Sequence, residues 1–259
     1  MNMPDSNETT SNRVSIKDLI PFILHPRSGF MKIARQPRRP WMLPLLLISL
    51  TAILCVVTAG YLKQQAALTG EVNIPPDFDY YTPEQQAQYF QATQATQGIT
   101  FVYILPIIGS LFGVWTTWLV TGGTLHFITT LFGGRGETVV SMNVVAWASL
   151  PLAIRNLVRF IYMLLSRHLI EGPGLSGLVT SSDSNWSVVL SSFLGIIDIY
   201  LIWYVLLLVI GVKVTTGLSS QKSIGSVIIT FVLIAMLQVA VQFLIAKIGD
   251  LSISRPFYF

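Results

Sequence analysis

Charged residues are scarce in this sequence of 259 residues, since Asp, Glu, Lys and Arg together make up only 11% of it. A soluble globular domain carries about 25% charged residues. Apolar residues make up 52% of the chain, and the mean hydropathy is +0.63. This composition excludes an ordinary soluble domain and predicts an all-α polytopic membrane protein, because helices satisfy their own backbone hydrogen bonds in lipid.

Cysteine and catalytic motifs are also scarce. The single cysteine, Cys55, excludes a disulfide within the chain. The three histidines are far apart in the sequence: His25, His126 and His168. They show no metal-site spacing. The GGRG stretch at 133–136 lacks the Gly-Lys-Ser/Thr ending of a phosphate-binding loop, and GLSG at 174–177 lacks the last glycine of a nucleophile elbow. We therefore expect no cofactor, no metal and no enzymatic activity.

Five apolar stretches are long enough to cross a hydrocarbon core of about 30 Å. They run over residues 41–62, 99–132, 139–165, 188–212 and 224–248. The second stretch would be about 50 Å long as one helix, so we expect a bend near Gly122. Its Gly109 and Gly113 form a GxxxG pattern, which favours packing within the bundle over a dimer face. The sequence thus predicts a five-span bundle over residues 41–248.

The remaining segments are polar. Residues 1–14 read as a disordered tail and residues 249–259 as a C-terminal tail. The loop 63–98 between the first two spans is acidic. Its second half has the start signals of a helix, with Thr82 as N-cap, Pro83 at the first position and Gln85 two residues later.

Residues 15–40 form a short amphipathic and basic segment, in which a helix is expected to begin at Pro26. Its basic residues are candidates for contacts with anionic lipid headgroups: Lys32, Arg35, Arg38 and Arg39. Two interpretations stay open. The segment either lies in the membrane plane and binds anionic lipid or a partner, or it only fixes the orientation of the chain.

Lys and Arg residues predict the orientation. With the N-terminus in the cytoplasm, ten of them fall on the cytoplasmic side and four on the other side. The acidic loop and the C-terminus then lie outside. The net charge of +4 is carried by the N-terminus, and because a basic flank beside a span is an ordinary orientation signal, we expect no nucleic-acid partner.

Three charges fall within the apolar stretches: Arg155, Arg159 and Asp198. Charges inside a membrane are costly and usually find partners. We predict that Arg155 pairs with Asp198 and that Arg159, one turn further on, reaches toward the headgroups. In the alternative interpretation both arginines reach the headgroups and Asp198 bonds a neighbouring hydroxyl.

Four stretches carry a family resemblance. They are HPRSGFMKIARQPRRPWMLPLLL, TPEQQAQYFQ, LFGGRGETVVSMNVVAWASLPLAIRNLV and IDIYLIWYVLLLVIGVKVTTGLSSQKSIGSVII. Together they resemble the prokaryotic members of the Yip-domain family over roughly residues 20–246. The third stretch is the most specific, a Gly-rich turn followed by an Ala-aromatic-Ala-Ser-Leu-Pro core. Its family-like residues are Gly133, Gly134, Gly136, Ala146, Ser149 and Pro151.

The resemblance implies a five-span bundle in a bacterial or archaeal plasma membrane. Eukaryotic Yip proteins are linked to Rab-type GTPases and membrane traffic, but this chain has no long cytoplasmic N-terminal domain, which argues against such a role. The family offers no catalytic residues. We therefore expect a membrane scaffold or adaptor with a membrane-protein partner or a second copy, and the alternatives are a transporter or lipid-handling protein and an intramembrane enzyme.

Overall fold

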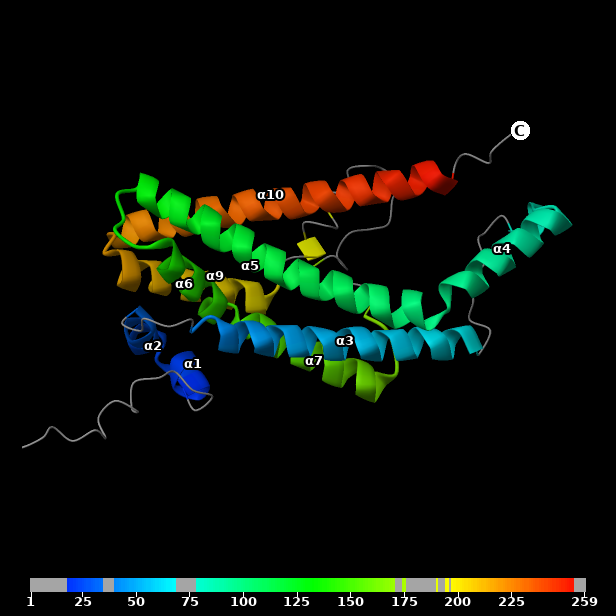
Figure 1. Ribbon diagram of the computed structural model, residues 1–259, viewed down its shortest axis with the longest axis horizontal. Helices are drawn as coiled ribbons and strands as arrows, with labels where there is room; N and C mark the ends of the chain where they lie inside the picture. Colours follow the sequence, from blue (N-terminus) through cyan, green and yellow to red (C-terminus); the bar gives the residue numbers. More distant parts are fainter. Residues whose placement is uncertain are drawn as a thin grey trace, which may run out of the picture. The chain divides into compact units, whose positions relative to one another are not determined.

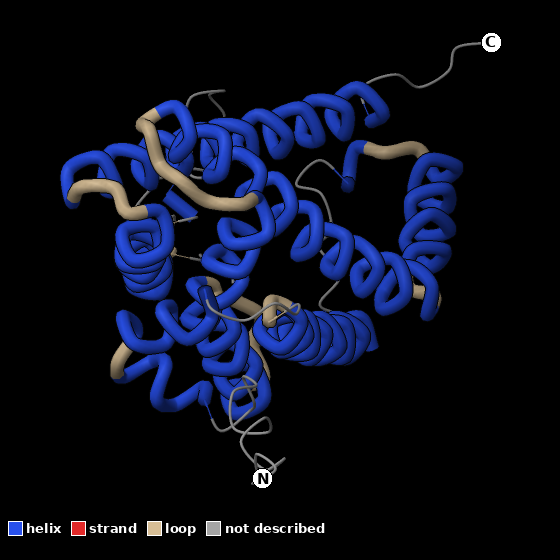
Figure 2. Tube along the Cα trace, turned by 60° about the vertical axis from the view of Figure 1, so that its left-hand side comes forward, coloured by secondary structure: helices blue, strands red, loops and turns tan. Residues whose placement is uncertain are grey.

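The structure is a computed structural model that describes residues 18–34, 40–68, 78–170, 174–175, 190, 194–195 and 197–253. In that part of the chain every regular element is a helix (Figure 2), which confirms the all-α prediction. The predicted tail 1–14, three of the basic residues (Arg35, Arg38 and Arg39) and residues 254–259 lie outside the described residues.

Figure 1 shows the order of the elements along the chain. The α-helices are α1 (Leu19–Leu24), α2 (Pro26–Ala34), α3 (Met42–Leu68), α4 (Pro83–Thr96), α5 (Leu105–Leu131), α6 (Thr138–Ala148), α7 (Leu150–Ser166), α9 (Ile199–Thr216) and α10 (Ser220–Ile253). A 3-10 turn, η2 (Phe78–Tyr80), precedes α4, and a π-helical turn, η3 (Thr100–Ile104), precedes α5.

Five candidate membrane spans occur in the described residues, as predicted. They are Met42–Ala67, Thr100–Leu131, Thr138–Ser166, Ile199–Thr216 and Ser220–Val241. Even the shortest, with 18 residues, is about 27 Å long, close to the thickness of the hydrocarbon core. The chain is therefore an integral, multi-pass membrane protein.

The second span starts with the π-helical turn η3 and continues as one α-helix to Leu131. The turn ends two residues before Pro106, whose ring in an α-helical turn would clash with the carbonyl four residues back, at Val102. A wider π turn removes that clash. α5 continues through Gly122 without a helix boundary, and the bend expected there stays a prediction. Gly122 packs against the side chain of Met142 on α6.

The third span is broken between α6 and α7, just before Pro151. A proline at this position removes one helical hydrogen bond and disfavours the helical conformation of the preceding backbone. The side chain of Ser149 donates a 2.7 Å hydrogen bond to the carbonyl of Ala146 at the break. The third span thus consists of two successive helices.

The fourth span begins later than its apolar stretch suggested. α9 starts at Ile199, and Asp198 is its N-cap, accepting a 2.8 Å hydrogen bond from the backbone N–H of Leu201. A carboxylate at this position satisfies one of the free N–H groups of the first turn. Asp198 therefore lies at a helix start rather than in the middle of a span.

The polar loop contains the helix that its start signals predicted. Thr82 and Gln85 form the reciprocal capping box at the start of α4. The ring of Phe78 packs against Tyr81, Tyr89 and Phe90, with centroid distances of 5.3–5.6 Å. This aromatic cluster folds η2 back onto α4.

Two compact units make up the chain. The first comprises residues 1–46, 117–152 and 171–259, and the second comprises residues 47–116 and 153–170. In the second unit the thiol of Cys55 donates to the carbonyl of Asn156 at 2.9 Å, and Tyr103 donates to the side chain of Gln64 at 2.9 Å. These bonds tie α3 to α7 and to η3. The first unit holds the N-terminal helices and the candidate site.

Candidate functional site

The N-terminal helices α1 and α2 form a small hairpin that packs on α6 and α9 (Figure 1). Pro26 supplies the fixed backbone angle that favours the first position of α2. The hydroxyl of Ser28 donates to the carbonyl of His25 at 2.8 Å and steadies the turn between the two helices. Phe30 and Ile33, one helical turn apart on α2, are buried.

Phe30 packs against α9 at a glycine. A Cβ atom at Gly211 would lie 2.9 Å from Cζ of Phe30 and 2.6 Å from Cγ1 of Val144 on α6. Real side chains do not approach this closely, so only glycine allows α2, α6 and α9 to meet here. Phe30 is fully buried as a result.

Trp147, near the end of α6, connects the hairpin to the start of the first span. Its indole N–H donates a 2.9 Å hydrogen bond to the carbonyl of Pro40, just before α3. Its ring lies 5.0 Å from that of Phe22 on α1, and Phe22 lies 4.9 Å from Phe30 in an edge-on arrangement. Trp147 is fully buried, with its only polar atom satisfied.

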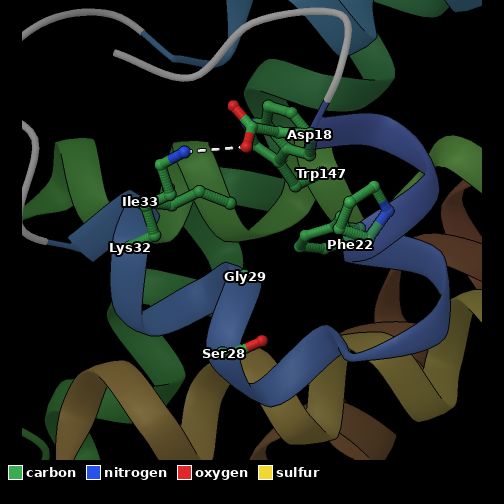
Figure 3. Close-up of a pocket in the computed structure, with 8 residues that line it drawn as sticks. Asp18, Phe22, Ser28, Gly29, Lys32, Ile33 and Trp147 are labelled. Carbon is green, nitrogen blue, oxygen red and sulfur yellow. Dashed lines mark hydrogen bonds and ion pairs between the residues drawn. The ribbon is translucent and has the colours of Figure 1, made fainter. Parts of the chain in front are cut away.

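Between the hairpin and Trp147 lies a cavity of about 170 Å³. Its lining residues come from α1, α2 and α6, with Asp18 just before α1: Asp18, Pro21, Phe22, Ser28, Gly29, Lys32, Ile33 and Trp147. The ammonium of Lys32 donates to the carboxylate of Asp18 at 2.7 Å (Figure 3). These two side chains are 35% and 27% exposed, whereas Phe22 is 3% exposed. The charged pair therefore lies at the open side of the cavity and the rings at its closed side.

The pairing of Lys32 changes its predicted role. We expected Lys32 to contact anionic headgroups together with Arg35, Arg38 and Arg39, and those three lie outside the described residues. In the structure the charge of Lys32 is balanced by Asp18. Headgroup contacts by the four basic residues stay a prediction.

The family-like glycines form the turn between α5 and α6. Gly133 has a positive φ of 84°, a conformation that favours glycine. A Cβ at Gly134 would lie 2.8 Å from the carbonyl of Thr129, whereas one at Gly136 would meet nothing within 4 Å. The backbone N–H of Arg135 donates to the carbonyl of Thr216 at 3.2 Å, which joins this turn to the end of α9.

The other family-like residues are buried at the break of the third span. Ala146 is fully buried, and Ser149 and Pro151 are buried beside it. Trp147 lies between Ala146 and Ser149 in the sequence and lines the cavity, so the buried residues around it fix its place in the helix. These residues therefore have a structural part in the candidate site.

The intramembrane charges are divided between the two units. Arg155 and Arg159 lie one turn apart on α7, and both are half-buried. Asp198 belongs to the other unit, where its carboxylate caps α9. The predicted Arg155–Asp198 pair stays a prediction.

The sequence predicted the residues of the turn and of the proline break, but not the cavity. Phe22, Trp147 and Gly211 lie in three separate segments, and their local patterns mark only apolar helices. Within the described ranges, no three His, Cys, Asp or Glu side chains are close enough to hold a metal ion.

The Yip1 domain model matches residues 21–241, which include most of α1, all of α2 and all five candidate spans. The chain belongs to the Yip1 domain family. No curated protein and no solved structure matches the chain. The cavity residues Phe22, Lys32 and Trp147 lie within the matched range, so the candidate site is part of the Yip1 domain, whereas Asp18 precedes it.

Proposed function

We propose that this Yip1-domain protein is a non-enzymatic membrane scaffold or adaptor that binds another membrane protein within the bilayer. The observation that carries the proposal is the exposure of the second span, Thr100–Leu131. Only 6% of its most apolar stretch is buried, compared with 50% for Thr138–Ser166. An apolar span left open in this way offers its surface to lipid or to another membrane helix.

The glycines of α5 favour a helix as the neighbour. No described residue would lie within 4 Å of a Cβ atom at Gly109 or Gly113. Phe112, between them in the sequence, is 71% exposed. Small residues with this spacing let a second helix approach closely, and close approach is the main source of stability between helices in lipid.

A photo-crosslinking residue at Phe112 tests the proposal in native membranes. We expect a protein adduct of one discrete mass and stoichiometric co-purification of the same protein with the unmodified chain. The same crosslinker at Leu125, on α5 but only 1% exposed, is the matched control and should give no such adduct.

The substitution Gly113→Leu sharpens the test. It should remove the adduct at Phe112 while the chain stays folded, because the described residues leave space around this glycine. Lipid adducts alone at Phe112, or a protein adduct that survives Gly113→Leu, would contradict an adaptor role for α5.

Transport or lipid handling through Arg155, Arg159 and Asp198 is the second candidate. The half-buried positions of both arginines on the third span favour it, because charges in a membrane often mark a path for ions or substrates. Reconstituted protein that moves ions, solutes or lipids, and loses this activity with Arg155→Leu, would support it over the adaptor.

A further inference from the structure

The cavity under the N-terminal hairpin has no part in the adaptor function proposed for α5. It combines a closed side of aromatic rings with an open side that carries one positive and one negative charge. An apolar cavity of about 150 Å³ is known to hold a molecule the size of benzene. A cavity of about 170 Å³ can therefore take a small organic group.

We propose that this cavity binds the phosphate ester of an amino alcohol, the chemistry of a phosphoethanolamine or phosphocholine headgroup. The ammonium of the ligand lies beside the rings of Phe22 and Trp147 and meets the carboxylate of Asp18. The phosphate stays at the open side and meets the ammonium of Lys32. This inference does not depend on the adaptor function.

The aromatic lining favours the ammonium end of the ligand. Phe22 and Trp147 are buried against each other at the closed side. Aromatic rings attract cations at their faces, and cages of rings next to a carboxylate are suited to ammonium groups. An aliphatic lining would attract only the apolar part of a ligand.

The ion pair favours a ligand that carries both charges. The oppositely charged atoms of Lys32 and Asp18 are 2.7 Å apart, so the opening has no net charge. A purely anionic ligand would be drawn to Lys32 but repelled by Asp18. A zwitterion inserted between the two gives each residue an opposite charge, and neither is left buried without a partner.

The position of the cavity favours a lipid as the source of the ligand. Trp147 is bonded to the carbonyl of Pro40, just before the first span starts. Phe30, next to the cavity, packs on Gly211, which lies about 7.5 Å before the end of α9. The hairpin thus lies near the ends of two membrane spans, in the zone where headgroups are found.

Two binding measurements on the purified full chain test the proposal. Isothermal titration with soluble phosphoethanolamine measures the shared headgroup chemistry. Native mass spectrometry in detergent compares bound phosphatidylethanolamine with bound phosphatidylglycerol. Binding of the soluble ester together with selective retention of phosphatidylethanolamine identifies the lipid, whereas binding of the soluble ester alone identifies a free phosphate ester. Absence of both overturns the proposal.

Substitutions at the charged pair locate the site. Asp18→Asn and Lys32→Met should each weaken binding of phosphoethanolamine at least about tenfold. The matched controls are Asp79→Asn and Lys63→Met, which change exposed charges in the second unit and should leave affinity within about twofold. Equal affinities in all four variants would place the ligand elsewhere.

Weaker binding in the charge variants would be ambiguous if they undocked the hairpin, so a substitution of an aromatic ring serves as a second test of the site. Phe22→Leu retains apolar volume but removes the ring face, so it should weaken phosphocholine binding several-fold. Resistance of α2 to proteolysis is measured in the same variant, because Phe22 also packs against Phe30 and Trp147. Unchanged phosphocholine binding in this variant, with the hairpin still protected, would contradict an aromatic ammonium site.

Discussion

Substituting Gly211 by alanine should release the N-terminal hairpin from the membrane helices. A Cβ at this position would lie 2.6 Å from Val144 and 2.9 Å from Phe30, both closer than side chains tolerate. Overpacking of this kind costs about 1–3 kcal/mol. Undocking of α2 relieves the contact with Phe30, while the higher helix propensity of alanine acts on α9 in both states. The part of the cost that comes from Phe30 therefore falls on the docked state alone, whereas the contact with Val144 on α6 acts in both states.

The expected result is a larger fraction of molecules with α2 undocked, by about fivefold to 150-fold. Tryptic cleavage at Lys32, inside α2, measures this fraction when opening is fast compared with cleavage. The chain is incubated with trypsin in detergent, and the peptide that ends at Lys32 is followed by mass spectrometry.

Gly225→Ala is the matched control for this experiment. It lies in the same unit on α10, and a Cβ there would make only ordinary contacts with Phe132, at 3.7 and 3.8 Å. Its cleavage rate should equal that of the unmodified chain. Adding Phe30→Leu to Gly211→Ala should restore part of the protection. An unchanged rate in Gly211→Ala would refute the packing argument.

Three further predictions concern topology, lipid and charge. In a chain with Cys55→Ser, a cysteine at Tyr80, which is 88% exposed, should react with an impermeant thiol reagent only from outside the cell; reaction from the cytoplasm alone would reverse the topology. A peptide of residues 13–40 should bind vesicles of anionic lipid in low salt and leave them in high salt, and equal binding to neutral vesicles would exclude electrostatic attraction. If Arg155 pairs with Asp198, Asp198→Ala should destabilise the chain more than the double variant with Arg155→Leu does; strictly additive effects in this cycle would remove the pair.

The elements of the fold could be predicted because each depends on nearby residues. A run of apolar residues long enough to cross a bilayer is a local property, and all five spans follow from it. The capping box of Thr82 and Gln85 involves residues three apart, and the break at Pro151 follows from a missing N–H and a clash within one turn.

The later start of α9 shows where local patterns are ambiguous. The apolar run from 188 reads as a continuation of the span, but α9 begins only after Asp198. The side chain of Asp198 can bond the backbone of the first turn, which favours a helix start over a place inside a helix. A hydropathy scale does not include the free energy of the hydrogen bond between the Asp198 side chain and the backbone of the first turn.

The cavity and its charged pair were decided by tertiary structure. The carboxylate of Asp18 meets the ammonium of Lys32, fourteen residues further on. Phe22 and Trp147 come together only because α1 packs at the end of α6, and apolar side chains attract one another without specifying a partner. The sequence alone thus determined which segments are helices and which cross the membrane, whereas close packing of α1, α2 and α6 decided which residues surround the cavity.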